Sequence, residues 1–134
     1  MDVGKLPKVG ETIVLVEDEE RVRTLCSLVL RKAGYQVIEA KNGREAMDIV
    51  KNLKSPINLL LTDVVMPEMN GKEVADLITN QFPDVRVIYM SGFIGEIAID
   101  KTDSHFLQKP FTPTILTSKV EDTLSHKDKN NQKN

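Results

Sequence analysis

INLLLTDVVMPEMNG, residues 57–71, decides the fold of this 134-residue chain. Its first part, residues 57–62, is mostly apolar, and Ser55 and Pro56 end the preceding helical pattern just before it. A short apolar run bounded by such breakers is typical of a strand that is buried on both faces of a sheet. We therefore predict a buried parallel strand over residues 57–62, with Asp63 at its carboxyl end.

Four more segments have the composition of strands. Residues 12–16, TIVLV, form a β-branched apolar run that ends abruptly in Glu17 and Asp18. The pattern of this run matches that of the segment before Asp63, so a second buried strand is predicted to deliver acids to the edge of the sheet. The remaining strands are predicted at residues 35–40, 85–90 and 105–108.

Helix signals lie between the strands. Apolar residues at helical spacing predict a helix from Glu19 to Ala33, with Gly34 after its end. Asn42 and Asn70, each followed three residues later by a glutamate, predict two more helices, and Thr112 is the predicted N-cap of a last one. The residues expected to face the core are Val22, Leu25, Cys26, Val29, Ala33, Ala46, Ile49, Val50, Leu53, Val74, Leu77, Ile78, Leu116, Val120 and Leu124.

The alternation of strands and helices predicts an α/β fold. Parallel strands need crossover helices, and right-handed crossovers place helices on both faces of the sheet. The fold class is therefore a (βα)5 doubly wound parallel five-stranded sheet. Ligands bind such sheets at the carboxyl ends of the strands.

The composition limits the functions that this chain can have. Hydrophobic residues make up 40% and charged residues 28%, which suits one domain, and the net charge of -2 argues against direct binding of nucleic acid. No apolar run approaches the roughly 18 residues of a membrane span, so we expect a cytoplasmic domain with no membrane insertion. Cys26, the single cysteine, is interpreted as a buried structural thiol.

Chemically useful side chains follow the predicted strands at one edge of the sheet. Glu17 and Asp18 follow the first strand, Asp63 the third, Ser91 the fourth and Lys109 the fifth. Each of these residues alone is more often an ordinary strand end or turn residue. Their conjunction at a single edge instead predicts a functional site.

Four motifs in order give the chain a family resemblance: VEDEE (16–20), LTDVVMPEMNG (61–71), MSGF (90–93) and FLQKPF (106–111). From about residue 12 to residue 124 the chain resembles the receiver domain of response regulators. The resemblance implies a flavodoxin-like fold with strand order 2-1-3-4-5. It places the receiver domain at residues 12–125. The polar composition of the two ends predicts a lead or linker at 1–11 and a disordered tail at 126–134.

The resemblance assigns Asp63 as the phosphoacceptor of a two-component phosphorelay. Mg²⁺ would be bound by Asp18, Asp63 and the backbone carbonyl of Val65, with Glu17 acting through a bound water, a hard oxygen environment that Mg²⁺ prefers. Zinc is disfavoured because the chain has no cluster of Cys and His.

Three further residues have roles implied by the resemblance. Lys109 would pair with Asp63 at rest and with a phosphoryl oxygen after transfer, and Ser91 would hydrogen-bond another phosphoryl oxygen. Phe106 occupies the position of the aromatic switch residue, and the peptide between Lys109 and Pro110 is expected to be cis. The resemblance also implies a domain that catalyses its own phosphorylation. Because Val65 cannot orient an attacking water, we expect slow dephosphorylation.

The resemblance also implies the partners. The donor would be a phosphohistidine on a histidine kinase or a histidine phosphotransfer domain, and the chain would be a monomer or a weak dimer. The motifs look most like those of a receiver at the C-terminus of a hybrid histidine kinase. The segment between Ser91 and Lys109 is about four residues shorter than in familiar receivers, so its helix is expected to be short, displaced or mobile.

Two alternatives belong to other classes of protein. A receiver-like interaction domain would keep the fold without phosphorylation, but degenerate members usually lack an acid, the acceptor or the lysine. A haloacid dehalogenase-type hydrolase would need a DxD motif, whereas this chain has DVV at Asp63.

Overall fold

A parallel sheet forms the centre of the computed structural model, which describes residues 10–92 and 105–132, and side chains as far as residue 125. Its strands are β1 (Thr12–Val16), β2 (Gln36–Ala40), β3 (Leu59–Asp63), β4 (Arg86–Ser91) and β5 (Phe106–Gln108). The order across the sheet is β2-β1-β3-β4-β5, and every neighbouring pair is parallel. The predicted fold class and strand order are confirmed.

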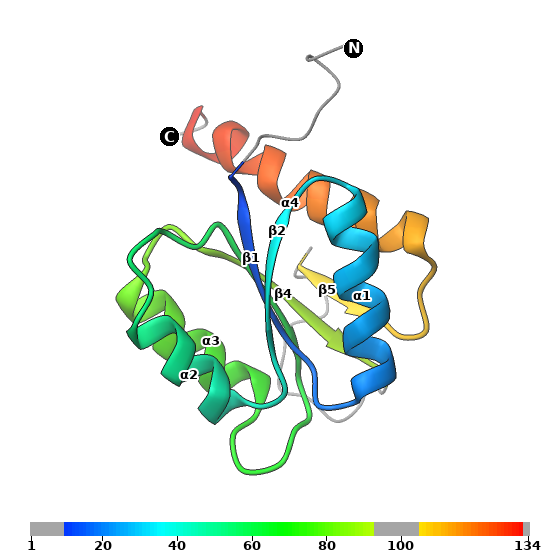
Figure 1. Ribbon diagram of the computed structural model, residues 1–134. Helices are drawn as coiled ribbons and strands as arrows, with labels where there is room; N and C mark the ends of the chain where they lie inside the picture. The colour runs from blue at the N-terminus through cyan, green and yellow to red at the C-terminus, as the bar shows by residue number, and fades with distance from the viewer. Residues whose placement is uncertain (1–9, 93–104, 133–134) are drawn as a thin grey trace.

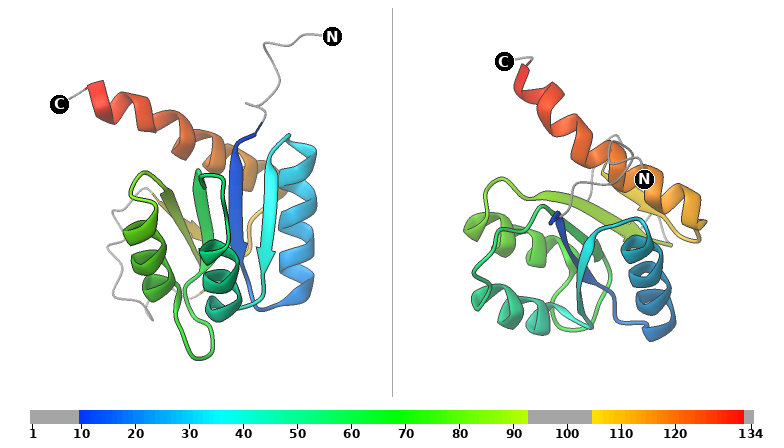
Figure 2. Two further views of the ribbon diagram at one scale, coloured as in Figure 1. Left: turned by 60° about the vertical axis from the view of Figure 1, so that its left-hand side comes forward. Right: turned by 45° about the horizontal axis from the view of Figure 1, so that its top comes forward.

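Helices cover both faces of this sheet. The described helices are α1 (Glu20–Lys32), α2 (Gly43–Lys51), α3 (Gly71–Gln81) and α4 (Pro113–Gln132). Figures 1 and 2 show α1 and α4 on one face and α2 and α3 on the other. The short helix expected between Ser91 and Lys109 falls on residues 93–104, which lie outside the described residues.

The core is divided by the sheet into two apolar layers. β1 and β3 are buried along their whole length, and successive side chains point to opposite faces. Val14 and Leu60 therefore pack with α2 and α3, whereas Leu15 and Leu61 pack with α1 and α4. Helical residues that complete the two layers are Ala46, Val50, Val74 and Ile78 on one side and Cys26, Leu30, Leu116 and Val120 on the other.

Hydrogen bonds at the helix ends follow the predicted caps. The Asn70 side chain accepts from the Glu73 amide, and the Glu73 carboxylate accepts from the Asn70 amide, which completes a capping box. Asn42 likewise accepts from the Glu45 amide, but the Glu45 carboxylate accepts from the amide of Lys41 instead. The N-caps of α2 and α3 are thus confirmed, and only α3 has the reciprocal bond.

Two residues predicted to face the core are exposed instead. Leu25 is 54% exposed and Leu77 is 45% exposed, while Leu30 and Ala75 are buried. At 100° per residue, Leu25 and Leu77 lie at or beyond the edge of the inward face of their helices, which the other buried residues define. Cys26 is buried as predicted, and burial raises the pKa of its thiol to about 11.

The end of α4 differs from the sequence prediction. Residues 126–132, predicted to be part of a disordered tail, continue the helix to Gln132. After Pro113 the segment contains neither proline nor glycine, so nothing in the backbone chemistry stops the helix at residue 125.

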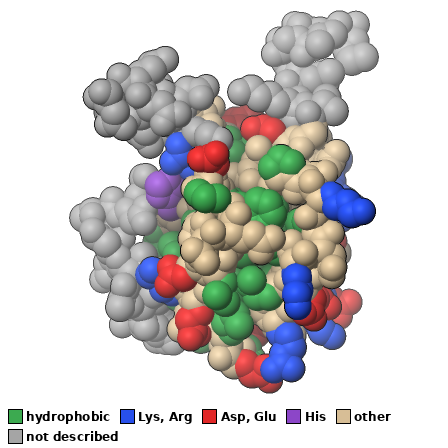
Figure 3. Space-filling view, turned by 90° about the vertical axis from the view of Figure 1, so that its left-hand side faces the viewer, with side chains coloured by type: hydrophobic (Ala, Val, Ile, Leu, Met, Phe, Trp, Pro, Cys, Tyr) green, Lys and Arg blue, Asp and Glu red, His purple; other side chains and the backbone are tan. Residues whose placement is uncertain are grey.

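The surface carries charges of both signs. Figure 3 shows the side of α2 and α3, where positive and negative side chains lie next to one another between scattered hydrophobic groups. Ion pairs between Lys72 and Asp76, 3.0 Å apart, and between Arg44 and Glu68, 3.6 Å apart, contribute to this pattern. Among the described helices, none is long and apolar enough to cross a membrane.

The first residue of α3 allows a close backbone approach that we use for a prediction. A Cβ on Gly71 would lie 2.2 Å from the carbonyl oxygen of Asp63, whereas a Cβ on Gly92 would meet nothing nearer than 3.9 Å. Because backbone must move to relieve the clash, Gly71→Ala should lower the free energy of unfolding by roughly 2 kcal/mol or more. Gly92→Ala should change it by less than about 0.5 kcal/mol. Urea unfolding midpoints measure both, and equal midpoints would contradict the prediction.

Candidate functional site

The register of the sheet brings the predicted site residues to one edge. Val16 lies opposite Thr62, Asp63 opposite Met90, and Ser91 opposite Gln108. The residues that end or follow these strands therefore meet at their carboxyl ends, as expected for ligand-binding residues in a doubly wound sheet. They are Glu17, Asp18, Asp63, Ser91 and Lys109.

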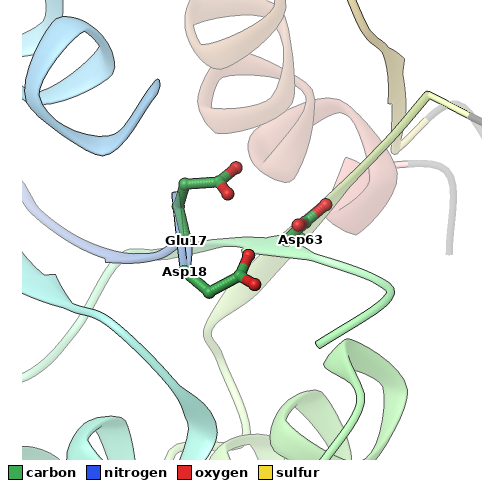
Figure 4. A group of neighbouring side chains, drawn as sticks. All are labelled: Glu17, Asp18 and Asp63. Carbon is green, nitrogen blue, oxygen red and sulfur yellow. The ribbon is translucent and has the colours of Figure 1, made fainter. Parts of the chain in front are cut away.

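Three carboxylates converge at this edge. Ligand oxygens of Glu17, Asp18 and Asp63 all lie within 4.8 Å of one another, and Figure 4 shows Glu17 and Asp18 leaving the end of one strand next to Asp63. Glu17 is fully buried, Asp63 is 8% exposed and Asp18 is exposed. Two of the three acids, Glu17 and Asp63, are thus buried, and Asp18 lies at the solvent-exposed side of the group.

Lys109 provides the positive charge beside these acids. Its Nζ lies 3.3 Å from Asp63 Oδ1, so the ion pair expected from the resemblance is present in the structure. A second and shorter contact, 2.6 Å long, joins the same Nζ to Glu17 Oε1. Lys109 therefore forms ion pairs with both buried acids and not with Asp63 alone.

Glu17 is held at both of its carboxylate oxygens. Oε1 accepts from Lys109, and Oε2 accepts from the backbone amide of Glu19 at 3.0 Å. The sequence predicted Glu17 only as an outer ligand of a metal and missed its contact with Lys109. A contact between residues 92 positions apart leaves no local spacing signal that could have revealed it.

The surroundings shift the pKa values of Asp63 and Lys109. Burial, with the negative charge of Glu17 next in importance, raises the pKa of Asp63 to about 6, although Lys109 acts in the opposite direction. Burial alone would lower the pKa of Lys109, but its hydrogen bond to Glu17 and the charges of Glu17 and Asp63 outweigh this effect, so its pKa lies above the usual value. Lys109 therefore stays an ammonium at neutral pH.

The backbone of Asp63 is fixed from several directions. The Thr62 hydroxyl donates to the Asp63 carbonyl at 3.0 Å, and the Val64 amide donates to the Met90 carbonyl at 2.9 Å. The Gly71 amide donates to the Val64 carbonyl at 2.8 Å and keeps α3 against this turn. These bonds place the Asp63 side chain on a rigid strand end.

Other predicted site residues lie around the acids. Ser91 is the buried last residue of β4, and its carbonyl accepts from the Lys109 amide at 2.9 Å. Val65 is 51% exposed, two residues beyond Asp63. Phe106 is partly buried and packs against the layer under α2 and α3, opposite Tyr89. The peptide between Lys109 and Pro110 is cis, as expected.

The donor set has the chemistry of a site for a hard cation. The three residues supply carboxylate oxygens alone, which are the ligands that Mg²⁺ takes in proteins. The open side at Asp18 leaves room for the water ligands that Mg²⁺ keeps, and Glu17 is already engaged by two donors. The acidic cluster therefore fits Mg²⁺, and Asp18 and Asp63 are the carboxylates that could hold it.

Relatives of this chain are signalling proteins. It is 36% identical over 117 residues to the response regulator receiver protein CpdR of Brucella abortus, and this match covers 84% of the chain and 95% of CpdR. It is also 34% identical over 121 residues to the sensor kinase CckA of the same bacterium. That match covers 87% of the chain but only 13% of the kinase, so the chain spans a small part of that relative.

Solved structures and a family model agree with these relatives. The receiver domain of the hybrid histidine kinase CckA superimposes with a TM-score of 0.72 at 32% identity, over 84% of this chain and 98% of that domain. The model of the response regulator receiver domain matches residues 13–121. With the fold and its acidic edge in place, the chain belongs to the response regulator receiver domain family.

Proposed function

We propose that this receiver domain accepts a phosphoryl group on Asp63 from a phosphohistidine. The observation that carries the proposal is the position of the Asp63 carboxylate, which is buried at a strand end between two other acids and the Lys109 ammonium. A carboxylate in such a setting can act as the nucleophile towards a phosphoryl group, because the neighbouring ammonium can offset the negative charge that the group brings.

The transfer exchanges one bond to phosphorus for another. A carboxylate oxygen of Asp63 forms the new bond, the phosphorus–nitrogen bond of the donor breaks, and the electron pair stays on the imidazole nitrogen, which then takes a proton. Because the transferring oxygens carry negative charge, acceleration depends on cations placed beside them. Bound Mg²⁺ would supply part of this charge, with Asp18 and Asp63 as carboxylate ligands, Val65 contributing its carbonyl and Glu17 acting through a water.

Lys109 is placed to follow the phosphoryl group. Its Nζ lies 3.3 Å from Asp63 but has a closer partner in Glu17, which holds it near the acceptor before transfer. A phosphoryl group on Asp63 adds oxygens that attract the ammonium more strongly than a lone carboxylate does. We infer that Lys109 shifts towards these oxygens and that this shift is one part of the response.

Ser91 and Phe106 are the proposed carriers of the signal. The Ser91 hydroxyl would bind a second phosphoryl oxygen and draw the end of β4 inward. Phe106 lies opposite Tyr89, two residues before Ser91, so a movement of this strand reaches the aromatic ring through neighbouring residues of the sheet. The ring would then change rotamer between a partly exposed and a buried position.

The partner class follows from the donor chemistry and the relatives. We propose that a histidine kinase or a histidine phosphotransfer domain supplies the phosphoryl group, either within one hybrid kinase or between separate proteins. We also propose that the domain works in the cytoplasm, together with this donor. We propose a monomer or weak dimer that binds no nucleic acid directly.

The first prediction from the proposed function concerns the acceptor. Treatment with acetyl phosphate and Mg²⁺ should add one phosphoryl group to the native chain, because small phosphodonors can replace the phosphohistidine. Asp63→Asn should remove this adduct, and Asp48→Asn, at an exposed position on α2, should keep it. Intact-protein mass spectrometry measures both, with and without Mg²⁺. A native chain that gains no adduct would favour a phosphorylation-independent interaction domain.

The second prediction uses the raised pKa of Asp63. The carboxyl titrates near its ordinary value when the chain is unfolded and at about 6 when it is folded, so burying its charge costs stability above pH 6, and this cost disappears as the pH falls below 4. Without metal, Asp63→Asn should therefore raise the free energy of unfolding by roughly 1–3 kcal/mol at pH 8 and by about half as much at pH 5. Lys109 keeps Glu17 as a partner in this variant.

Denaturant titrations in the presence of a chelator measure this difference at the two pH values. Asp48→Asn is the control, since an exposed acid should change stability little at either pH. A gain that is larger at pH 5 than at pH 8 would contradict the assignment of the raised pKa to Asp63.

The third prediction concerns the lifetime of the phosphoryl group. Val65 cannot hydrogen-bond an attacking water, whereas an amide at this exposed position can. Val65→Asn should lose the phosphoryl group roughly two- to tenfold faster, the rate equivalent of one hydrogen bond. Leu77→Asn, another exposed apolar position, should leave the rate unchanged. Decay of the adduct mass after removal of acetyl phosphate gives the rates, and a native chain that decays as fast as Val65→Asn would refute the prediction.

A further inference from the structure

Arg23 of α1 reaches back to the end of β1. Its side chain is only 17% exposed, and its Nη1 donates a hydrogen bond of 2.9 Å to the backbone carbonyl of Glu17. Its Nε lies 3.6 Å from Oε1 of Glu39 on β2. One guanidinium thus joins the strand end that carries two of the site acids to the neighbouring strand.

The Glu17 carbonyl belongs to the peptide unit that leads into Asp18. This unit is planar, so a bond that fixes the carbonyl also fixes the amide and Cα of Asp18. The Glu17 amide on the other side donates to the Ala40 carbonyl at 3.1 Å, so both backbone polar groups of Glu17 are anchored. Asp18 itself is exposed, so this backbone, and not side-chain packing, sets the direction of its Cα–Cβ bond.

We propose that Arg23 is a positioning residue that aims the Asp18 carboxylate at the metal position through the Glu17 carbonyl. The inference rests on the proposed function, because it assumes that Asp18 is a ligand of Mg²⁺. A planar guanidinium suits this task, since its separate N–H groups can bind the carbonyl and face the Glu39 carboxylate together. The compact ammonium of a lysine cannot keep both contacts.

Arg31 of the same helix provides a matched control. Its Nη2 lies 3.4 Å from Glu39 Oε2 and donates to the Val37 carbonyl at 2.9 Å, and its Nε donates to Ser27 at 2.9 Å. Arg23 and Arg31 therefore share Glu39 as an acidic partner and both tie α1 to β2. Only the contacts of Arg23 include the carbonyl of Glu17.

The test compares R23Q, R23K and R31Q with the native chain by NMR titration with magnesium chloride. R23Q should weaken Mg²⁺ binding by roughly tenfold, at the low end of the effect of residues that orient metal ligands, and R31Q by less than about twofold. R23K should fall between them. Without metal, R23Q should also change the carbonyl ¹³C shift of Glu17 and the amide shift of Asp18, which R31Q should leave in place.

The outcomes separate the inference from the proposed function. Equal Mg²⁺ affinities of R23Q and R31Q, or an unchanged Glu17 carbonyl shift in R23Q, would overturn the positioning role while native binding leaves the proposed function intact. A native chain that neither binds Mg²⁺ nor takes a phosphoryl group would overturn both. If R23Q does not fold, R23K decides by the same two measurements against R31Q.

Discussion

Three carboxylates whose oxygens lie within 4.8 Å of one another repel strongly, and the Lys109 ammonium offsets this repulsion. Lys109 lies nearer to Glu17 than to Asp63, so the fully buried Glu17 receives the stronger compensation and Asp63 the weaker. Burial and then the negative charge of Glu17 raise the pKa of Asp63, and Lys109 offsets these two effects only in part. A carboxylate that is incompletely neutralised gains more from an arriving cation than one that is already paired.

The rest of the fold holds the polar edge in place. β1 and β3 are apolar and fully buried as far as Val16 and Leu61, and charge begins only where the strands leave the sheet. Packed layers on both faces resist sliding of these strands, so the acids keep their separation despite their repulsion. Gly71 adds a constraint from α3 by letting the helix backbone meet the Asp63 carbonyl.

The sequence predicted the parts of the molecule that have a local pattern. Apolar runs located the strands within one or two residues, and the asparagine caps located the starts of α2 and α3. Which side of a helix faces the core was less certain at the edges of the apolar stripe, as Leu25 and Leu77 show. The contact of Lys109 with Glu17 joins segments 92 residues apart that only the tertiary fold brings together. The contact of Arg23 with the Glu17 carbonyl spans six residues and depends on the path of the turn between β1 and α1, and neither contact was predicted.

The two charges at the centre of the site come from opposite ends of the chain. Glu17 and Lys109 are 92 residues apart, and β5 is the last strand to be added to the sheet. During synthesis the acids of β1 and β3 therefore exist before their cation has been made. A nascent chain that stops short of β5 carries a cluster of acids without compensation, and an apolar strand edge at β4 without its neighbour. Completion of the last strand thus adds both the edge strand and the cation of the site in a single event, so the charge balance of the site depends on complete folding.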